Sequence, residues 1–219
     1  MRFIAKFFSY VTHPLLGATY ILLLLLAVNP FLFGVSSLAE KWPLILLVFA
    51  SSFLIPALVI LMMLGLEMIP SLDMPGREQR TIPLIAVGML YLGLFTFCKN
   101  SADIPVAYTA LVLGCVVGLW VGFFINLFSK ISLHAIGMGG LIGAVLVTIE
   151  LFAYDRFSVL LPGGNELQVS LVTVLAIVLL LAGLVGTARL YLKAHVLEDV
   201  AGGYLVGFAA MAGAVWAWV

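Results

Sequence analysis

The chain has 219 residues, of which 64% are hydrophobic and only 9% are charged, and its formal net charge is zero. No soluble fold of this length could cover so much apolar surface with so few charges, and apolar runs of about 20 residues recur along the chain. The neutral balance argues against a polyanionic partner, so we expect no nucleic acid to bind. Because the runs are continuous rather than alternating, they predict transmembrane α-helices and not barrel strands.

The N-terminal segment 1–12 is basic and amphipathic, with Arg2 and Lys6 among phenylalanines, and it predicts an interfacial helix that leads into the first span. Seven spans follow, and Pro56 is expected to kink the second. We expect the spans at 14–34, 43–66, 82–98, 104–128, 132–154, 168–190 and 199–218. The longest polar connections, 67–81 and 155–168, leave no room for a second domain. The prediction is an all-α fold, one polytopic transmembrane bundle of six to seven spans covering residues 1–219.

Polar residues gather in three segments, Asp73–Arg80, Lys130–His134 and Arg189–Asp199, each next to the end of a predicted span. Two spans separate each segment from the next, and an even number of spans returns the chain to the same face of the membrane. The three segments are therefore expected to converge. The competing interpretation is that arginines and lysines simply collect in cytoplasmic loops, with His134 a satisfied polar residue at a helix start.

The orientation of this face stays open. It carries seven cations, whereas the other face carries only Lys41, Lys99 and Arg156. The positive-inside rule would place the more basic face in the cytoplasm, but cations that bind an anion do not report topology. The short loops favour a bacterial inner-membrane protein.

His195 and Asp199 are four residues apart, so they share one face if the last helix begins a turn early. A carboxylate in this position fixes the imidazole tautomer and stabilises the imidazolium, which suits a nucleophile or a base. His134, which arrives from another helix, could protonate a leaving group. This pattern predicts phosphoryl transfer through a phosphohistidine.

A dense set of cations accompanies these histidines. Guanidinium groups bind phosphoryl oxygens in pairs, and a helix that begins at Ser132 adds backbone donors and a favourable dipole end. Asp73 and Glu78 are expected either to orient the nearest arginines or to lie in a solvated loop. The expected phosphate ligands are Arg189, Ser132, Arg77, Arg80, Lys130 and Lys193.

A metal site is the weaker alternative. His134, His195, Glu198 and Asp199 are candidate ligands, but the neighbouring cations would repel a metal ion and no dense ligand spacing is present. We therefore expect no metal and no cofactor.

Several other features have simpler interpretations. His13, directly before Pro14, is expected to be structural rather than catalytic. The spaced glycines, among them Gly203 and Gly207, are expected to let helices approach closely. A homodimer formed through a glycine-lined face stays open.

The last polar segment resembles a motif of the type 2 phosphatidic acid phosphatase superfamily of membrane lipid phosphatases. That family has Ser-Arg, five residues, His, three residues and Asp, and this chain has Ala188-Arg189, five residues, His195, three residues and Asp199. The family's middle motif is Pro-Ser-Gly-His, which the segment 131–134, Ile-Ser-Leu-His, matches at the serine and the histidine. Its first motif, Lys, six residues and Arg-Pro, has only a loose counterpart in 73–83.

The resemblance implies roles for individual residues. His195 would be the nucleophile, Asp199 its orienting carboxylate and His134 the general acid. Arg189 and Ser132 would be phosphate ligands, joined by Arg77 and Arg80. Leu133 stands where the family has a glycine and Ala188 where it has a serine, and two predicted spans lie between the first two motifs, so the chain is identified as a divergent member.

Two functions from different classes follow. The first is a metal-independent enzyme that hydrolyses a phosphate or pyrophosphate monoester of a membrane lipid through a phosphohistidine intermediate. The second is a non-catalytic anionic-lipid binding protein or transporter that uses the same cationic pocket. His195 discriminates between them, because binding alone would survive its replacement by glutamine.

Overall fold

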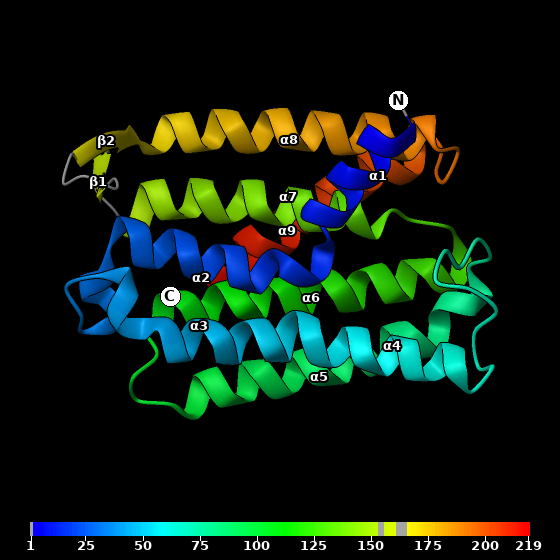
Figure 1. Cartoon of the computed structure of the whole chain (residues 1–219), viewed down its shortest axis with the longest axis horizontal. Coiled ribbons are helices and arrows are strands. Elements are labelled where there is room, and N and C mark those ends of the chain that lie inside the picture. The colour runs from blue at the N-terminus through cyan, green and yellow to red at the C-terminus, as the bar shows by residue number, and fades with distance from the viewer. Residues whose placement is uncertain (1, 153–155, 161–165) are drawn as a thin grey trace.

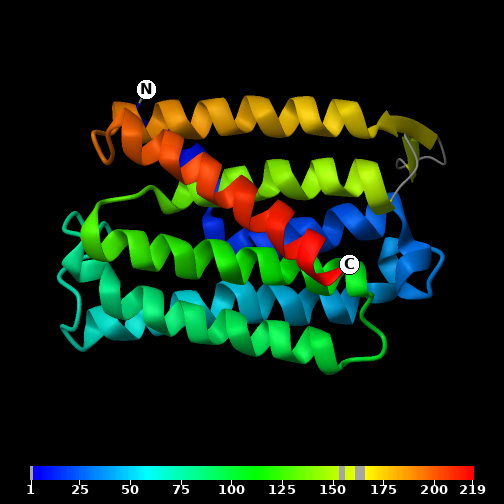
Figure 2. The same cartoon turned by 180° about the vertical axis from the view of Figure 1, so that it is seen from behind.

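The structure is a computed structural model that describes residues 2–152, 156–160 and 166–219. Within these residues seven helices are long and apolar enough to cross a membrane, as the sequence predicts. Most of them run side by side along the length of the molecule, and the last crosses them obliquely (Figures 1 and 2). The chain is a multi-pass membrane protein built as an α-helical bundle.

The first span is broken near its middle. The amphipathic helix α1, Arg2–Val11, is followed by a 3₁₀ turn, Pro14–Leu16, and then by α2, Gly17–Val28. Helix α1 packs against the end of α8 and lies at an angle to the other helices (Figure 1). Helix α2 ends before the predicted boundary at 34, because the backbone leaves the helical region at Asn29 and Pro30 follows.

The second span contains a π-turn. Helix α3, Trp42–Phe49, is joined to α4, Ile55–Gly65, through a π-turn over Ala50–Leu54. Pro56 has no N–H to donate to the carbonyl of Ser52, and its ring would clash with that carbonyl in a regular helix. The wider turn directly before the proline accommodates it.

The remaining helices follow the predicted spans closely at most boundaries. They are α5, Thr81–Asn100, α6, Val106–Phe128, α7, Leu133–Val147, which a π-turn extends through Phe152, α8, Leu171–Tyr191, and α9, Leu197–Trp218. The end of the predicted span 132–154 lies outside the described residues.

A β-hairpin replaces part of a predicted polar connection. Strand β1, Arg156–Leu160, pairs antiparallel with β2, Glu166–Ser170. The prediction that a span begins at 168 is therefore wrong, and α8 begins at Leu171 after the N-cap Ser170. Polar residues alternating with apolar ones from 166 to 170 suit a strand better than a span. The hairpin lies at the end of the bundle opposite α1 (Figure 1).

Helices α7 and α9 cross in the closest contact of the bundle. A Cβ atom on Gly203 would lie 2.7 Å from Ala135 Cβ and 2.8 Å from the carbonyl oxygen of Ser132. A Cβ on Gly207 would collide with the backbone of α7 at Ile136. The predicted role of these glycines in close packing is therefore confirmed, and they bring the first turns of α7 and α9 together.

Replacing Gly203 by alanine should destabilise the fold. The added methyl group has backbone and a helix-bound Cβ as neighbours, neither of which can move aside, so we expect a loss of about 1–3 kcal/mol. Thermal unfolding in detergent measures the effect. Gly202→Ala is the matched control, since nothing lies within 4 Å of its Cβ position. Equal stability of the two variants would contradict the crossing described above.

Candidate active site

A cavity of about 560 Å³ lies among the helices and reaches the end of the bundle where the three polar segments meet. Side chains from each segment line it, together with residues of α1 and of the turn that follows. The convergence predicted from the even numbers of spans is therefore confirmed. The ionisable groups along the wall, apart from tyrosines and a cysteine, are Lys6, His13, Asp73, Arg80, His134, Arg189 and His195.

His195 is held by a hydrogen bond to Asp199. Its Nδ1 atom lies 3.0 Å from Asp199 Oδ2, and the imidazole is almost fully buried. The same carboxylate oxygen accepts the backbone N–H of Val196 at 3.3 Å, which fixes it at the first turn of α9. A carboxylate only accepts hydrogen bonds, so Nδ1 carries the proton and Nε2 keeps a free lone pair.

The cavity keeps His195 neutral. Burial lowers the pKa of His195 to about 4, and the positive charges of Arg80, Arg189 and Lys130 act in the same direction. The hydrogen bond to Asp199 opposes this shift. Near neutral pH the residue is therefore an uncharged imidazole with a nucleophilic nitrogen.

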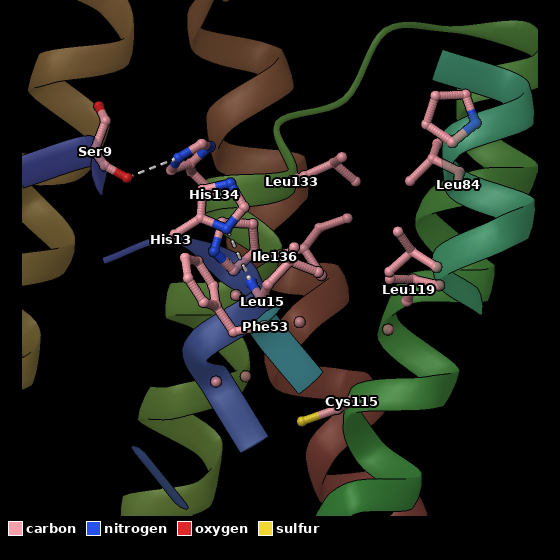
Figure 3. A pocket seen from close by; sticks show the side chains of 18 of the residues that line it. Ser9, His13, Leu15, Phe53, Leu84, Cys115, Leu119, Leu133, His134 and Ile136 are labelled. Carbon is pink, nitrogen blue, oxygen red and sulfur yellow. Dashed lines mark hydrogen bonds between the residues drawn. The ribbon is translucent and has the colours of Figure 1, made fainter. Parts of the chain in front are cut away.

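His134, at the start of α7, is oriented by the N-terminal helix. Its Nε2 atom lies 3.1 Å from the carbonyl oxygen of Ser9 in α1 (Figure 3). A carbonyl only accepts hydrogen bonds, so Nε2 is the donor and Nδ1 is left free to exchange a proton. A backbone group of α1 thus sets the tautomer of a residue on α7.

His13 is a third imidazole in the cavity, and sequence reasoning assigned it a structural role only. Its Nδ1 atom accepts the backbone N–H of Leu15 at 3.4 Å, which is the expected structural contact. Its ring also lies edge-on to His134, with centroids 5.5 Å apart (Figure 3). The break before Pro14 was the signal in the sequence, because it turns the chain back and places His13 beside the site.

Arg189 presents a buried donor without a partner. Its Nε atom is inaccessible and makes no hydrogen bond within the described residues, although the residue lines the cavity. The only other such donor in those residues, Trp120 Nε1, does not line the cavity. An unpaired buried donor costs about 1–3 kcal/mol, which a bound anion would recover. Asp73 lines the same cavity, and its negative charge stabilises the positive charge of Arg189.

The two arginines of the first polar segment have different positions. Arg80 lines the cavity and is only 7% exposed, and its Nε donates to the carbonyl of Met74 at 2.9 Å. Arg77 lies outside the cavity wall, where its Nε donates to Glu78 at 3.1 Å and its Nη1 to the carbonyl of Phe128. The orienting role expected for Glu78 is present, but the geometry does not place Arg77 at the site.

Three further expected phosphate ligands do not line the cavity. Ser132 is fully buried, and its hydroxyl caps α7 by accepting the N–H of Ala135. Lys130 lies behind the wall. Burial lowers the pKa of Lys130, and so do the charges of Arg80 and Arg189.

Lys193 lies two residues after the end of α8 and is exposed to solvent. Its N–H donates to the carbonyl of Leu190, and the N–H of Ala194 donates to that of Arg189, which is the Schellman pattern. The position has a φ of +53°, a left-handed conformation that favours glycine. Lys193 was predicted as a phosphate ligand because of its charge. It is instead exposed just beyond the end of α8 and does not line the cavity.

The described residues contain no group of three or more histidine, cysteine, aspartate or glutamate side chains placed to hold a metal ion. Glu198, one of the candidate metal ligands, is exposed on the first turn of α9. Apart from tyrosines and a cysteine, the ionisable groups on the cavity wall are imidazoles, guanidinium groups, the amine of Lys6 and the carboxylate of Asp73.

Comparisons of the chain with protein-family models, curated proteins and solved structures gave no match.

The ionisation of His195 can be measured directly. With isotope-labelled histidine in detergent micelles, we expect the imidazole signal that His195→Gln removes to titrate with a pKa near 4. Asp199→Asn should lower that pKa further, because the carboxylate raises it. Since the folded value lies below the ordinary 6.5, this group should also reduce stability as the pH falls from about 6.5 toward 4. A pKa near 6.5 in the wild type would contradict the described environment.

Lys193→Gly tests whether this residue is a helix cap. Glycine adopts the left-handed conformation without strain, so we expect stability to rise by about 1 kcal/mol in thermal unfolding. Lys193→Ala removes the same charge but keeps the strain, and its stability should stay within about 0.5 kcal/mol of the wild type. A similar change in both variants would assign the effect to the charge instead.

Proposed function

We propose that this protein is an integral membrane lipid phosphatase that hydrolyses a phosphate or pyrophosphate monoester of a membrane lipid. The observation that carries the proposal is the bond from His195 Nδ1 to Asp199, which leaves Nε2 unprotonated on a residue of the cavity wall. The resemblance of the segment 188–199 to the type 2 phosphatidic acid phosphatase motif points in the same direction. The short loops favour a bacterial inner membrane as its location.

The first step would transfer the phosphoryl group to the enzyme. The lone pair on His195 Nε2 attacks phosphorus, and the bond from phosphorus to the lipid oxygen breaks. His134 gives a proton from Nδ1 to the leaving oxygen while its Nε2–H stays on the Ser9 carbonyl. The proton on Nδ1 can arrive with the substrate, because a phosphate monoester with a second pKa near 6 is partly a monoanion at neutral pH. The products are a lipid alcohol, or a lipid monophosphate from a pyrophosphate, and phosphohistidine.

The second step would return the enzyme to its starting state. A water molecule gives a proton to Nδ1 of His134 and attacks phosphorus, and the phosphorus to nitrogen bond breaks. Inorganic phosphate takes the proton from His134 Nδ1 and leaves as the monoanion, and His195 recovers its lone pair. Asp199 stays ionised throughout and stabilises the positive charge that develops on the His195 ring.

The charges around the cavity suit this chemistry. Arg80, Arg189 and Lys6 line the wall against one carboxylate, Asp73, so an entering phosphate meets a net positive site. Arg189 lines the cavity and offers its guanidinium group to a phosphoryl oxygen. Because these groups are already in place on the cavity wall, they can stabilise charge with little reorganisation.

The second candidate is a protein that binds or moves an anionic lipid without cleaving it. Its support is the same cationic cavity, together with the substitution of Leu133 for a glycine of the family motif. Binding requires the positive charges but not the lone pair on His195.

Phosphate release from lipid phosphates in detergent, with chelator present, tests the enzymatic proposal. His195→Gln and Asp199→Asn should each lower kcat/KM by about 10³-fold or more, and His134→Ala by about 10²-fold or more. Denaturing the His134 variant at alkaline pH, where phosphohistidine is stable, should trap phosphate on the protein if breakdown of the intermediate becomes slow.

Lys41→Gln is the control for the loss of a charge, since Lys41 lies directly before α3 and does not line the cavity; it should behave as the wild type. Arg189→Gln removes a charge in the cavity and should raise KM and lower kcat. If no lipid phosphate is cleaved, while native mass spectrometry shows an alkyl phosphonate bound equally to the wild type and to His195→Gln, the enzymatic proposal is overturned in favour of binding.

A further inference from the structure

The cavity continues well beyond its polar end. Below His13 and His134 its wall is apolar and is contributed by several different helices. Cys115 on α6 projects into this part of the cavity, and Phe53 covers the side nearest His13 (Figure 3). Other apolar side chains of this wall include Ile21, Ile60, Val87, Leu119, Leu141 and Met211. An apolar wall offers no hydrogen bonds or charges to a phosphate group. The cavity as a whole therefore matches a molecule with one polar and one apolar end.

Two exposed residues mark an opening on the side of the bundle. Tyr10 on α1 is 71% exposed and Leu61 on α4 is 50% exposed, yet both line the cavity. Helix α1 packs on α8, whereas α4 packs on α5 and on the π-turn. The cavity therefore reaches the surface between the amphipathic helix α1 and the apolar helix α4.

Resting on the proposed function, we infer that the apolar part of this cavity holds one hydrocarbon chain of the substrate, inside the bundle, with access between α1 and α4. The substrate is then a single-chain lipid phosphate or pyrophosphate, and the chain ends against Tyr91, Cys115 and Met211.

The size of the cavity supports one chain rather than two. Its volume of about 560 Å³ is that of a pocket for one drug-sized molecule, and it must hold the phosphate group as well. The floor of the cavity, formed by Tyr91, Cys115 and Met211, is also tightly packed. A Cβ on Gly114, directly before Cys115, would lie 3.0 Å from the Cα atom of Met211, so α6 and α9 leave no room there for a second chain.

Photo-crosslinking locates the chain without depending on turnover. The probe is dodecyl phosphonate with a photoreactive diazirine at the end of its chain, added to the purified protein in detergent. We expect crosslinks on Tyr91, Cys115 or Met211. The controls are Ile82 and Leu205, which lie on the same helices as Tyr91 and Met211 but are exposed and do not line the cavity. Crosslinks confined to such outer residues would overturn the inference.

Chain-length selectivity gives the second test. Cys115→Phe would fill the floor and should lower the ratio of kcat/KM for hexadecyl phosphate to that for octyl phosphate by about ten-fold or more. Gly93→Phe adds the same bulk to α5 where nothing lies within 4 Å, and its ratio should equal that of the wild type. An unchanged ratio in Cys115→Phe would contradict a chain held at this floor.

The two proposals fail in different ways. Crosslinks inside the cavity without phosphate release from any alkyl phosphate would keep the chain site and overturn the hydrolytic function. Phosphate release with crosslinks only on the outer surface would keep the function and overturn the chain site.

Discussion

The close crossing of α7 and α9 is the constraint on which the rest of the site depends. His134 lies on the first turn of α7, and His195 and Asp199 lie at the start of α9, so both histidines can serve one cavity only if these two helix starts are adjacent. The glycines of α9 allow this approach, because Gly203 and Gly207 meet α7 backbone where any side chain would collide. The backbone N–H of Ser132 donates to the carbonyl of Asp199 at 3.2 Å, which connects the two helix starts directly. The lack of a side chain at Gly203 and Gly207 therefore allows the packing that brings His134 and His195 to one cavity.

Two carboxyl or carbonyl acceptors then decide which nitrogen of each imidazole can react. Asp199 takes the proton of His195 Nδ1, and the Ser9 carbonyl takes that of His134 Nε2. One ring is left with a free Nε2 and the other with a free Nδ1, so the proposed nucleophile and proton carrier differ in tautomer as well as in position. The positive groups nearby reinforce the neutral state of His195, because they lower its pKa together with burial. Electrostatics suited to binding an anion thus also keep the nucleophile available.

Much of this arrangement could be predicted from the sequence. Continuous apolar runs gave the seven spans, and counting them placed three polar segments at one end of the bundle. The pairing of His195 with Asp199 followed from their spacing once α9 began at Leu197. Charge alone was a poor guide to the ligands, because Arg77 and Lys193 are engaged in a loop contact and a helix cap. The hairpin and the π-turn were missed, since both arise from local competition between backbone hydrogen bonds and side-chain constraints that hydrophobicity does not report.

The sequence predicted an interfacial segment 1–12 before a first span that begins at 14, and the turn between α1 and α2 lies where this boundary was expected. A continuous helix from Ala5 to Val28 would satisfy hydrophobicity, yet the chain turns at His13 and Pro14, so α1 leans across α8 while α2 starts deeper in the bundle (Figure 1). Lys6, Ser9 and His13, on the N-terminal side of this turn, line the cavity. The same segment carries the Ser9 carbonyl that orients His134. Because His13, Pro14 and Leu15 line the same cavity, the turn borders both its polar end and its apolar part, so the proposed sites for a phosphate group and for a hydrocarbon chain would be continuous.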